Sequence, residues 1–105
     1  MGKMSRNKGK AGEREVASFL RDYGYDARRG QQYAGIHGDA DVIGLPGIHI
    51  EVKRTERLDL YGALDQSRRD AKEGELPTVW HRKNNCRLVV IIDADDFMKL
   101  YGEKQ

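Results

Sequence analysis

The chain has 105 residues, of which 38% are hydrophobic and 34% are charged, and its net charge is +2. This length provides a single domain with one thin core. The small net charge does not by itself indicate a nucleic-acid partner. No apolar run approaches the roughly 18 residues that a membrane span needs.

Cys86 is the only cysteine. An internal disulfide and a cysteine-based zinc site are therefore both excluded, which fits a reducing compartment. No apolar run follows the basic N-terminus, so we expect no signal peptide. The predicted location is the cytoplasm, without membrane contact and with a phage-encoded origin left open.

The first ten residues carry four basic side chains and no acid, and they predict a flexible basic arm ahead of one domain over residues 11–105. Hydrophobic periodicity and turn residues then divide the domain into eight elements. The predicted order α-β-β-β-α-β-β-α indicates an α/β fold with a mixed central sheet flanked by helices. The expected helices cover residues 11–23, 58–72 and 94–101, and the expected strands cover 25–29, 40–44, 48–53, 78–82 and 88–92.

Two further segments carry expectations of their own. Residues 30–38, which contain three glycines, are expected to form a loop. Residues 88–92 are a continuous apolar run, which is typical of a strand buried on both faces.

The second and third expected strands are joined by Leu45-Pro46-Gly47, a turn sequence that predicts an antiparallel hairpin. A slip of one residue in strand pairing moves every side chain to the other face. If Val42 lies opposite Ile50 on the apolar side, Asp41 lies opposite Glu51 on the polar side. This register needs an odd-length loop or a bulge, which we predict here.

Two opposed carboxylates repel each other unless a cation lies between them, because their Cβ atoms are only about 5 Å apart. Mg²⁺ accepts one or two carboxylates together with substrate phosphate. Lys53 follows Glu51 by two positions on the same face, about 6.6 Å along the strand. It could orient an attacking water or offset charge on a phosphate. The alternative is an ordinary solvent-facing strand on which glutamate and lysine alternate.

Glu13 lies on the apolar stripe of the first expected helix, with Val16, Ala17 and Leu20. A carboxylate on an inward face is costly unless it is paired or near a cation. Glu13 could therefore be a third acid of a metal site. Alternatively, it interacts with the dipole at the start of the helix.

Several short motifs together resemble the archaeal-type Holliday junction resolvases of the PD-(D/E)XK nuclease superfamily. The resemblance runs from residue 8 to about residue 92. It rests on Lys8-Gly9, Glu13-Arg14-Glu15, Gly24-Tyr25, Arg28, Asp41-Val42-Ile43, Glu51-Val52-Lys53, Leu64-Asp65-Gln66, Asp70-Ala71 and Pro77.

The resemblance implies a restriction-endonuclease-like core and Mg²⁺-dependent hydrolysis of a DNA phosphodiester, with Mn²⁺ as a possible substitute. In that family's pattern Glu13, Asp41 and Glu51 correspond to metal-binding acids, and Lys53 corresponds to the catalytic lysine. The backbone carbonyl of Val52 would be a further metal ligand. Asp39 competes with Asp41 for the ligand position, and the motif and register favour Asp41.

A branched or four-way DNA substrate needs two symmetric cuts, so a domain with one site implies a homodimer. Basic side chains near the expected site are candidates for phosphate contacts, although charged residues on exposed faces also keep a small domain soluble. The candidate DNA-binding residues are Lys8, Lys10, Arg28, Arg29, Arg54, Arg57, Gln66 and Arg69.

The chain also departs from the resolvase pattern. The spacing between Asp41 and Glu51 is short, and a Gly-Ser element is absent from the loop after the first strand. Two alternatives therefore stay open: a small phage-like nuclease that nicks duplex, flapped or single-stranded DNA, and a non-catalytic nucleic-acid-binding module. His49, beside Glu51, is interpreted as a solvated or structural histidine, with metal or phosphate contact as its alternative.

Overall fold

The computed structural model describes residues 3–31 and 40–103, and within them it contains a five-stranded sheet of order β1-β2-β3-β4-β5. Neighbouring strands are antiparallel except for β3 and β4, which are parallel. The predicted α/β class and element order are confirmed. The strands are β1 (Arg28–Arg29), β2 (Val42–Ile43), β3 (Ile48–Arg54), β4 (Leu76–Arg82) and β5 (Val89–Ile92).

The first helix, α1 (Lys3–Asp22), begins eight residues earlier than predicted. Residues 3–10 are therefore helical and continuous with the rest of α1, while the division into a basic arm and a domain over residues 11–105 stays a prediction. Residues 3–10 contain no proline, and extending a helix that is already docked costs far less than starting one. Although α1 has 20 residues, no helix in the described ranges is long and apolar enough to cross a membrane.

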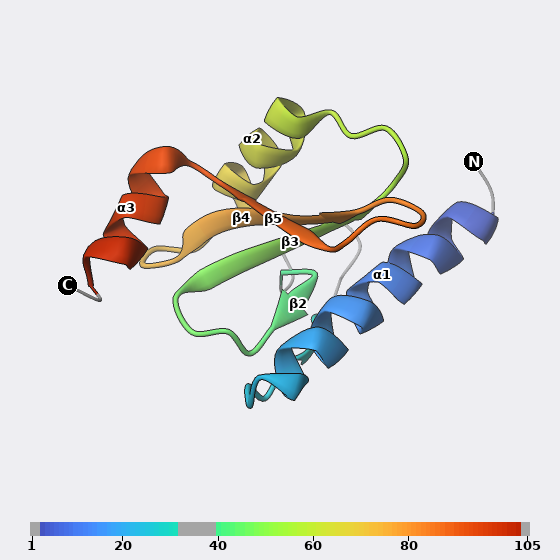
Figure 1. Ribbon diagram of the computed structural model, residues 1–105, viewed down its shortest axis with the longest axis horizontal. Helices are drawn as coiled ribbons and strands as arrows, with labels where there is room; N and C mark the ends of the chain where they lie inside the picture. Colours follow the sequence, from blue (N-terminus) through green and yellow to red (C-terminus); the bar gives the residue numbers. More distant parts are fainter. Residues whose placement is uncertain (1–2, 32–39, 104–105) are drawn as a thin grey trace.

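The two long helices cover opposite faces of the sheet (Figure 1). Helix α1 buries Val16, Ala17 and Leu20 against one face, together with Ile50 and Trp80 from the strands. The second helix, α2 (Leu60–Asp70), packs on the other face through a smaller cluster built around Ala63, Leu64 and Val79. Since strand side chains alternate between faces, Glu51 and Lys53 lie on the face that α2 covers.

The hairpin has the predicted register, with Val42 opposite Ile50. Gly44 makes the tight exit from β2 possible, because its φ is +109°. A Cβ at this position would also lie 2.7 Å from the Cα of Ala27, so no side chain fits there. The register that brings Asp41 to Glu51 thus depends on a glycine as well as on the apolar pattern.

The fifth strand differs from the prediction. Val89 and Val90 are each 47% exposed, so β5 is not buried on both faces. It is an edge strand, and the third helix, α3 (Ala94–Gly102), buries none of its residues. A continuous apolar run cannot reveal how many layers cover a strand. Val90 on β5 and Phe97 and Leu100 on α3 line one apolar hollow, and we call this surface the β5–α3 face.

Candidate active site

The site is centred on two carboxylates that the hairpin brings together. Asp41 immediately precedes β2, and Glu51 lies in the middle of β3, where it is only 5% exposed. Burial, and next to it the negative charge of Glu51, raises the pKa of Asp41 from 3.8 to about 7. The two groups share a hydrogen bond, as expected where a proton has to relieve the repulsion between two acids. The predicted pairing of Asp41 and Glu51 is confirmed.

The backbone of β3 also holds Asp41. The amide of Val52 donates a hydrogen bond of 2.8 Å to Oδ2 of Asp41 and lowers the pKa of Asp41 in part. This contact was missed in the sequence, since the amide of a strand residue is ordinarily assigned to the ladder. The predicted role of the Val52 carbonyl stays a prediction.

Glu13 is close enough for its charge to raise the pKa of Asp41. Its own carboxylate accepts a hydrogen bond of 2.9 Å from Nε of Arg29. Arg29, expected to contact DNA, is therefore engaged within the site. Within residues 3–31 and 40–103, no three acidic, histidine or cysteine side chains are already gathered tightly enough to hold a metal ion.

The donor set nevertheless fits a hard cation. Mg²⁺ takes carboxylate oxygens as ligands and needs only one or two of them from the protein. Asp41 and Glu51 supply such oxygens in a place where their mutual repulsion calls for positive charge. Glu13 could join them through its second oxygen, because the contact with Arg29 engages Oε1.

Lys53 points toward α2, where Nζ donates a hydrogen bond of 2.9 Å to Oε1 of Gln66. Gln66, predicted to support the site or contact DNA, thus fixes the direction of the lysine. Both side chains line a hollow of about 460 Å³ together with Arg57 and Arg69, two more of the predicted DNA-binding residues. Through this hollow, a ligand from outside the domain can reach Lys53.

The other predicted DNA-binding residues are more dispersed. Lys8 and Arg54 line a second hollow with Arg57, and both form ion pairs with Glu56, at 3.8 Å and 3.7 Å. Lys10 on α1 and Arg28 on β1 are exposed. Asp39, the competitor of Asp41, lies outside the described residues, as does most of the expected loop over residues 30–38.

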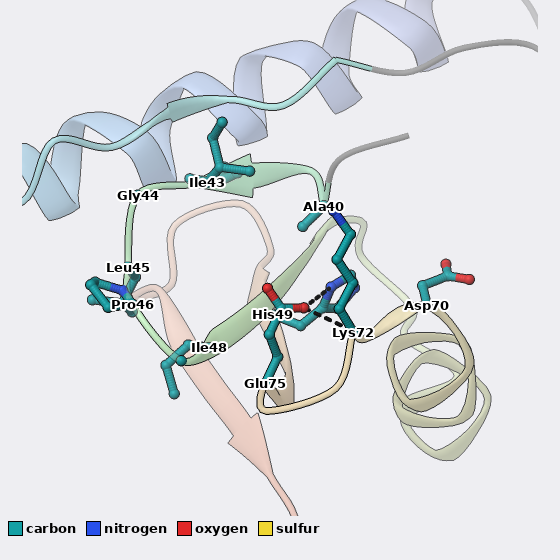
Figure 2. A pocket seen from close by; sticks show the side chains of 12 residues that line it. Ala40, Ile43, Gly44, Leu45, Pro46, Ile48, His49, Asp70, Lys72 and Glu75 are labelled. Atoms are coloured by element: carbon teal, nitrogen blue, oxygen red, sulfur yellow. Dashed lines mark hydrogen bonds and ion pairs between the residues drawn. The ribbon is translucent and has the colours of Figure 1, made fainter. Parts of the chain in front are cut away.

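His49 is a part of the site whose contacts the sequence did not reveal. It is only 3% exposed, and its Nε2 lies 2.9 Å from Oε1 of Glu51. Its Nδ1 lies 3.7 Å from Oε1 of Glu75, and Figure 2 shows the two side chains against each other. Burial alone would lower the pKa of His49. The hydrogen bond to Glu51 and the charges of Glu51, Glu75 and Asp70 outweigh burial and raise it.

The fold is that of the Holliday junction resolvases, as the resemblance predicted. Among solved structures, the chain is similar to Hjc, a Holliday junction resolvase from the archaeal hyperthermophile Archaeoglobus fulgidus, with a TM-score of 0.55 and 21% sequence identity. The match covers 81% of this chain and 72% of the archaeal protein. No protein-family model and no curated protein matches the sequence.

Proposed function

We propose that the protein is a metal-dependent DNA endonuclease that cuts Holliday junctions as a homodimer. The proposal is carried mainly by one observation: two carboxylates share a buried site, with the pKa of Asp41 raised to about 7 beside Glu51. Lys53 stands two positions further along the same strand. The fold shared with a known resolvase supports the same function.

The reaction is hydrolysis of one DNA phosphodiester. A water oxygen forms a bond to phosphorus, the bond to the 3′-oxygen breaks, and 5′-phosphate and 3′-hydroxyl ends result. A bound Mg²⁺ would lower the pKa of the attacking water and stabilise charge on the phosphoryl oxygens. Asp41 and Glu51 would hold it, with Glu13 as a further acid.

The residues of the chain supply positioning and charge. Lys53, held by Gln66 at 2.9 Å, offers its ammonium to the phosphate that undergoes cleavage. Arg57 and Arg69 line the same hollow and can bind neighbouring phosphates. The strand to be cut would therefore run along the hollow beside α2 and reach the carboxylates past Lys53.

The homodimer follows from the need for two symmetric cuts. The β5–α3 face is the surface that we assign to it. Exposed apolar patches of this kind are uncommon on monomers and mark interaction sites. On this face Val90, Phe97 and Tyr101 are between 47% and 53% exposed, and Phe97 stacks on Tyr101.

A gel assay tests the proposal. Purified protein is mixed with a four-way junction, a flap and a matched linear duplex, each with Mg²⁺ and with EDTA. We expect paired nicks in the junction that depend on Mg²⁺, and little cleavage of the duplex. Asp41→Asn and Lys53→Ala should bind junction DNA and leave it intact.

The outcomes separate the alternatives. Equal rates on junction and duplex would replace the resolvase assignment with a general nicking nuclease. DNA binding without cleavage under any metal would leave a non-catalytic binding module.

A further inference from the structure

Glu51 contacts His49, and His49 in turn contacts a second carboxylate, that of Glu75. His49 and Glu51 both lie on the face of β3 that α2 covers, and they are 3% and 5% exposed. The ring nitrogen Nε2 contacts Oε1 of Glu51 at 2.9 Å. The opposite nitrogen, Nδ1, faces Oε1 of Glu75 at 3.7 Å, so the ring stands between two carboxylates.

The other side chains and backbone groups around His49 keep the ring in that place. Its own carbonyl accepts a hydrogen bond of 2.7 Å from the Thr78 hydroxyl on β4. Oε1 of Glu75 accepts a hydrogen bond of 2.8 Å from the amide of Lys72, which keeps this carboxylate against the ring. Asp70 and Lys72 are the other charged groups that line the small cavity there, of about 260 Å³ (Figure 2).

A carboxylate that has to meet a cation needs a fixed orientation, and residues bonded to such ligands commonly supply it. We propose that His49 is a positioning residue for Glu51. Its Nε2 contacts Oε1 of Glu51 while Glu75 contacts the other ring nitrogen, and these two contacts direct the Glu51 carboxylate toward Asp41. The inference rests on the proposed function, since it assumes that Asp41 and Glu51 receive a divalent cation.

Two other features of the structure agree with this role. Glu51 and Asp41 repel each other, so an unrestrained Glu51 would turn away from the site. The contact with His49 opposes that rotation. The second histidine of the described sheet, His81, contacts a backbone oxygen, that of Thr55 at 2.9 Å, and within residues 3–31 and 40–103 it forms no ion pair with a carboxylate. It provides a matched control.

The experiment measures Mn²⁺ binding to the whole chain by calorimetry, without DNA, so that the readout does not depend on cleavage. We expect His49→Leu to weaken Mn²⁺ binding by about tenfold to a hundredfold, the range found for partners of metal ligands. His49→Gln, whose amide can still donate to Glu51, should restore much of the affinity. His81→Gln should bind Mn²⁺ like the wild type.

Glu75→Gln is a second, milder variant, because the Glu75 side chain is 32% exposed and we expect its replacement to leave the fold intact. It should weaken Mn²⁺ binding less than His49→Leu does. Thermal unfolding followed by circular dichroism checks that each variant is folded. If His49→Leu does not fold, Glu75→Gln decides, and an unchanged affinity in that variant overturns the proposal.

Two further results would overturn it: a folded His49→Leu that binds Mn²⁺ as tightly as the wild type, or an equal loss in His49→Leu and His49→Gln. These results leave the nuclease assignment standing if the wild type binds Mn²⁺ and cuts DNA. A wild type that does neither overturns the proposed function and, with it, the role of His49.

Discussion

Two regions of the sheet are built in opposite ways. On the face of β3 beneath α2, the ionisable side chains of His49, Glu51 and Lys53 each have a partner within about 3 Å. On the β5–α3 face, apolar side chains such as Val90 and Phe97 are half exposed and α3 buries no residue. The first region gives these three side chains partners within the domain, whereas the second leaves its apolar surface in contact with solvent.

This difference shows which functions one chain can provide alone. Placing charges in a low-dielectric setting requires fixed partners in the same molecule, since an unpaired buried charge is costly. An apolar face has no such requirement and can be completed by another molecule. We therefore assign chemistry to the first region and assembly to the second, and each prediction below tests one side of that division.

The largest effect is expected at the carboxylate pair. Glu51→Gln removes a charge that the metal site needs, and cleavage of a junction under single-turnover conditions should fall by at least about a hundredfold. Junction binding, measured by gel shift in Ca²⁺, should persist. Cleavage within a fewfold of the wild type would mean that Glu51 has no part in the chemistry.

Next in size is the pH dependence of stability without metal. The pKa of Asp41 is raised from 3.8 to about 7, so the folded chain binds this proton more tightly than the unfolded chain does. The stabilisation of the folded chain by protonated Asp41 is present below pH 4 and is lost as the pH rises through 7. It amounts to at most about 4 kcal/mol. The raised pKa of His49 acts in the same direction.

Urea unfolding in EDTA at several pH values measures this loss. Asp41→Asn should be more stable than the wild type at pH 8 and lose that advantage near pH 4. A wild-type stability that rises between pH 4 and pH 8 would contradict the repulsion between Asp41 and Glu51.

The hairpin that creates the pair can be broken at Gly44. Gly44→Ala puts a Cβ where φ is +109° and the backbone of Asp26 and Ala27 leaves no room. We expect a loss of about 1–3 kcal/mol of unfolding free energy. Chemical denaturation measures it, and Gly47→Ala is the control, because its Cβ would meet no atom within 4 Å and only φ, at +78°, is unfavourable.

The β5–α3 face is tested by Phe97→Asp, which puts a charge in the middle of the exposed apolar surface. Residues at the centre of an interface commonly contribute on the order of 2 kcal/mol. The variant should therefore shift a dimer toward monomer in analytical ultracentrifugation while each domain stays folded. A wild type that sediments as a monomer at high concentration would remove the assembly role of this face.

The smallest effect is expected at the hollow beside Lys53. Arg57→Ala removes one phosphate contact, so junction affinity should fall modestly and the slope of log affinity against log salt should decrease by about 1. Affinities measured at several salt concentrations show this. Arg87→Ala, also exposed but outside both hollows, should leave the slope unchanged.

The hairpin could be predicted because its two constraints, alternation in β3 and the turn at Pro46-Gly47, are local. Register then followed from burying Val42 against Ile50. No single segment of the sequence indicates that β3 pairs in parallel with β4. The contact of His49 with Glu75 depends on that pairing, because Glu75 directly precedes β4. The length of α1 and the exposure of β5 also depend on packing between elements, so α1 was predicted too short and β5 too buried.

The edge position of β5 has a consequence for the newly made chain. Four consecutive apolar residues, Val89–Ile92, lie on a strand that pairs with a neighbour on one side only within the described sheet. Such strands can recruit other extended chains and start aggregation. Charged Arg87 and Asp93 flank the segment, and charges in those places slow uncontrolled strand addition. Slow expression at low temperature should therefore yield more unaggregated protein than rapid expression does.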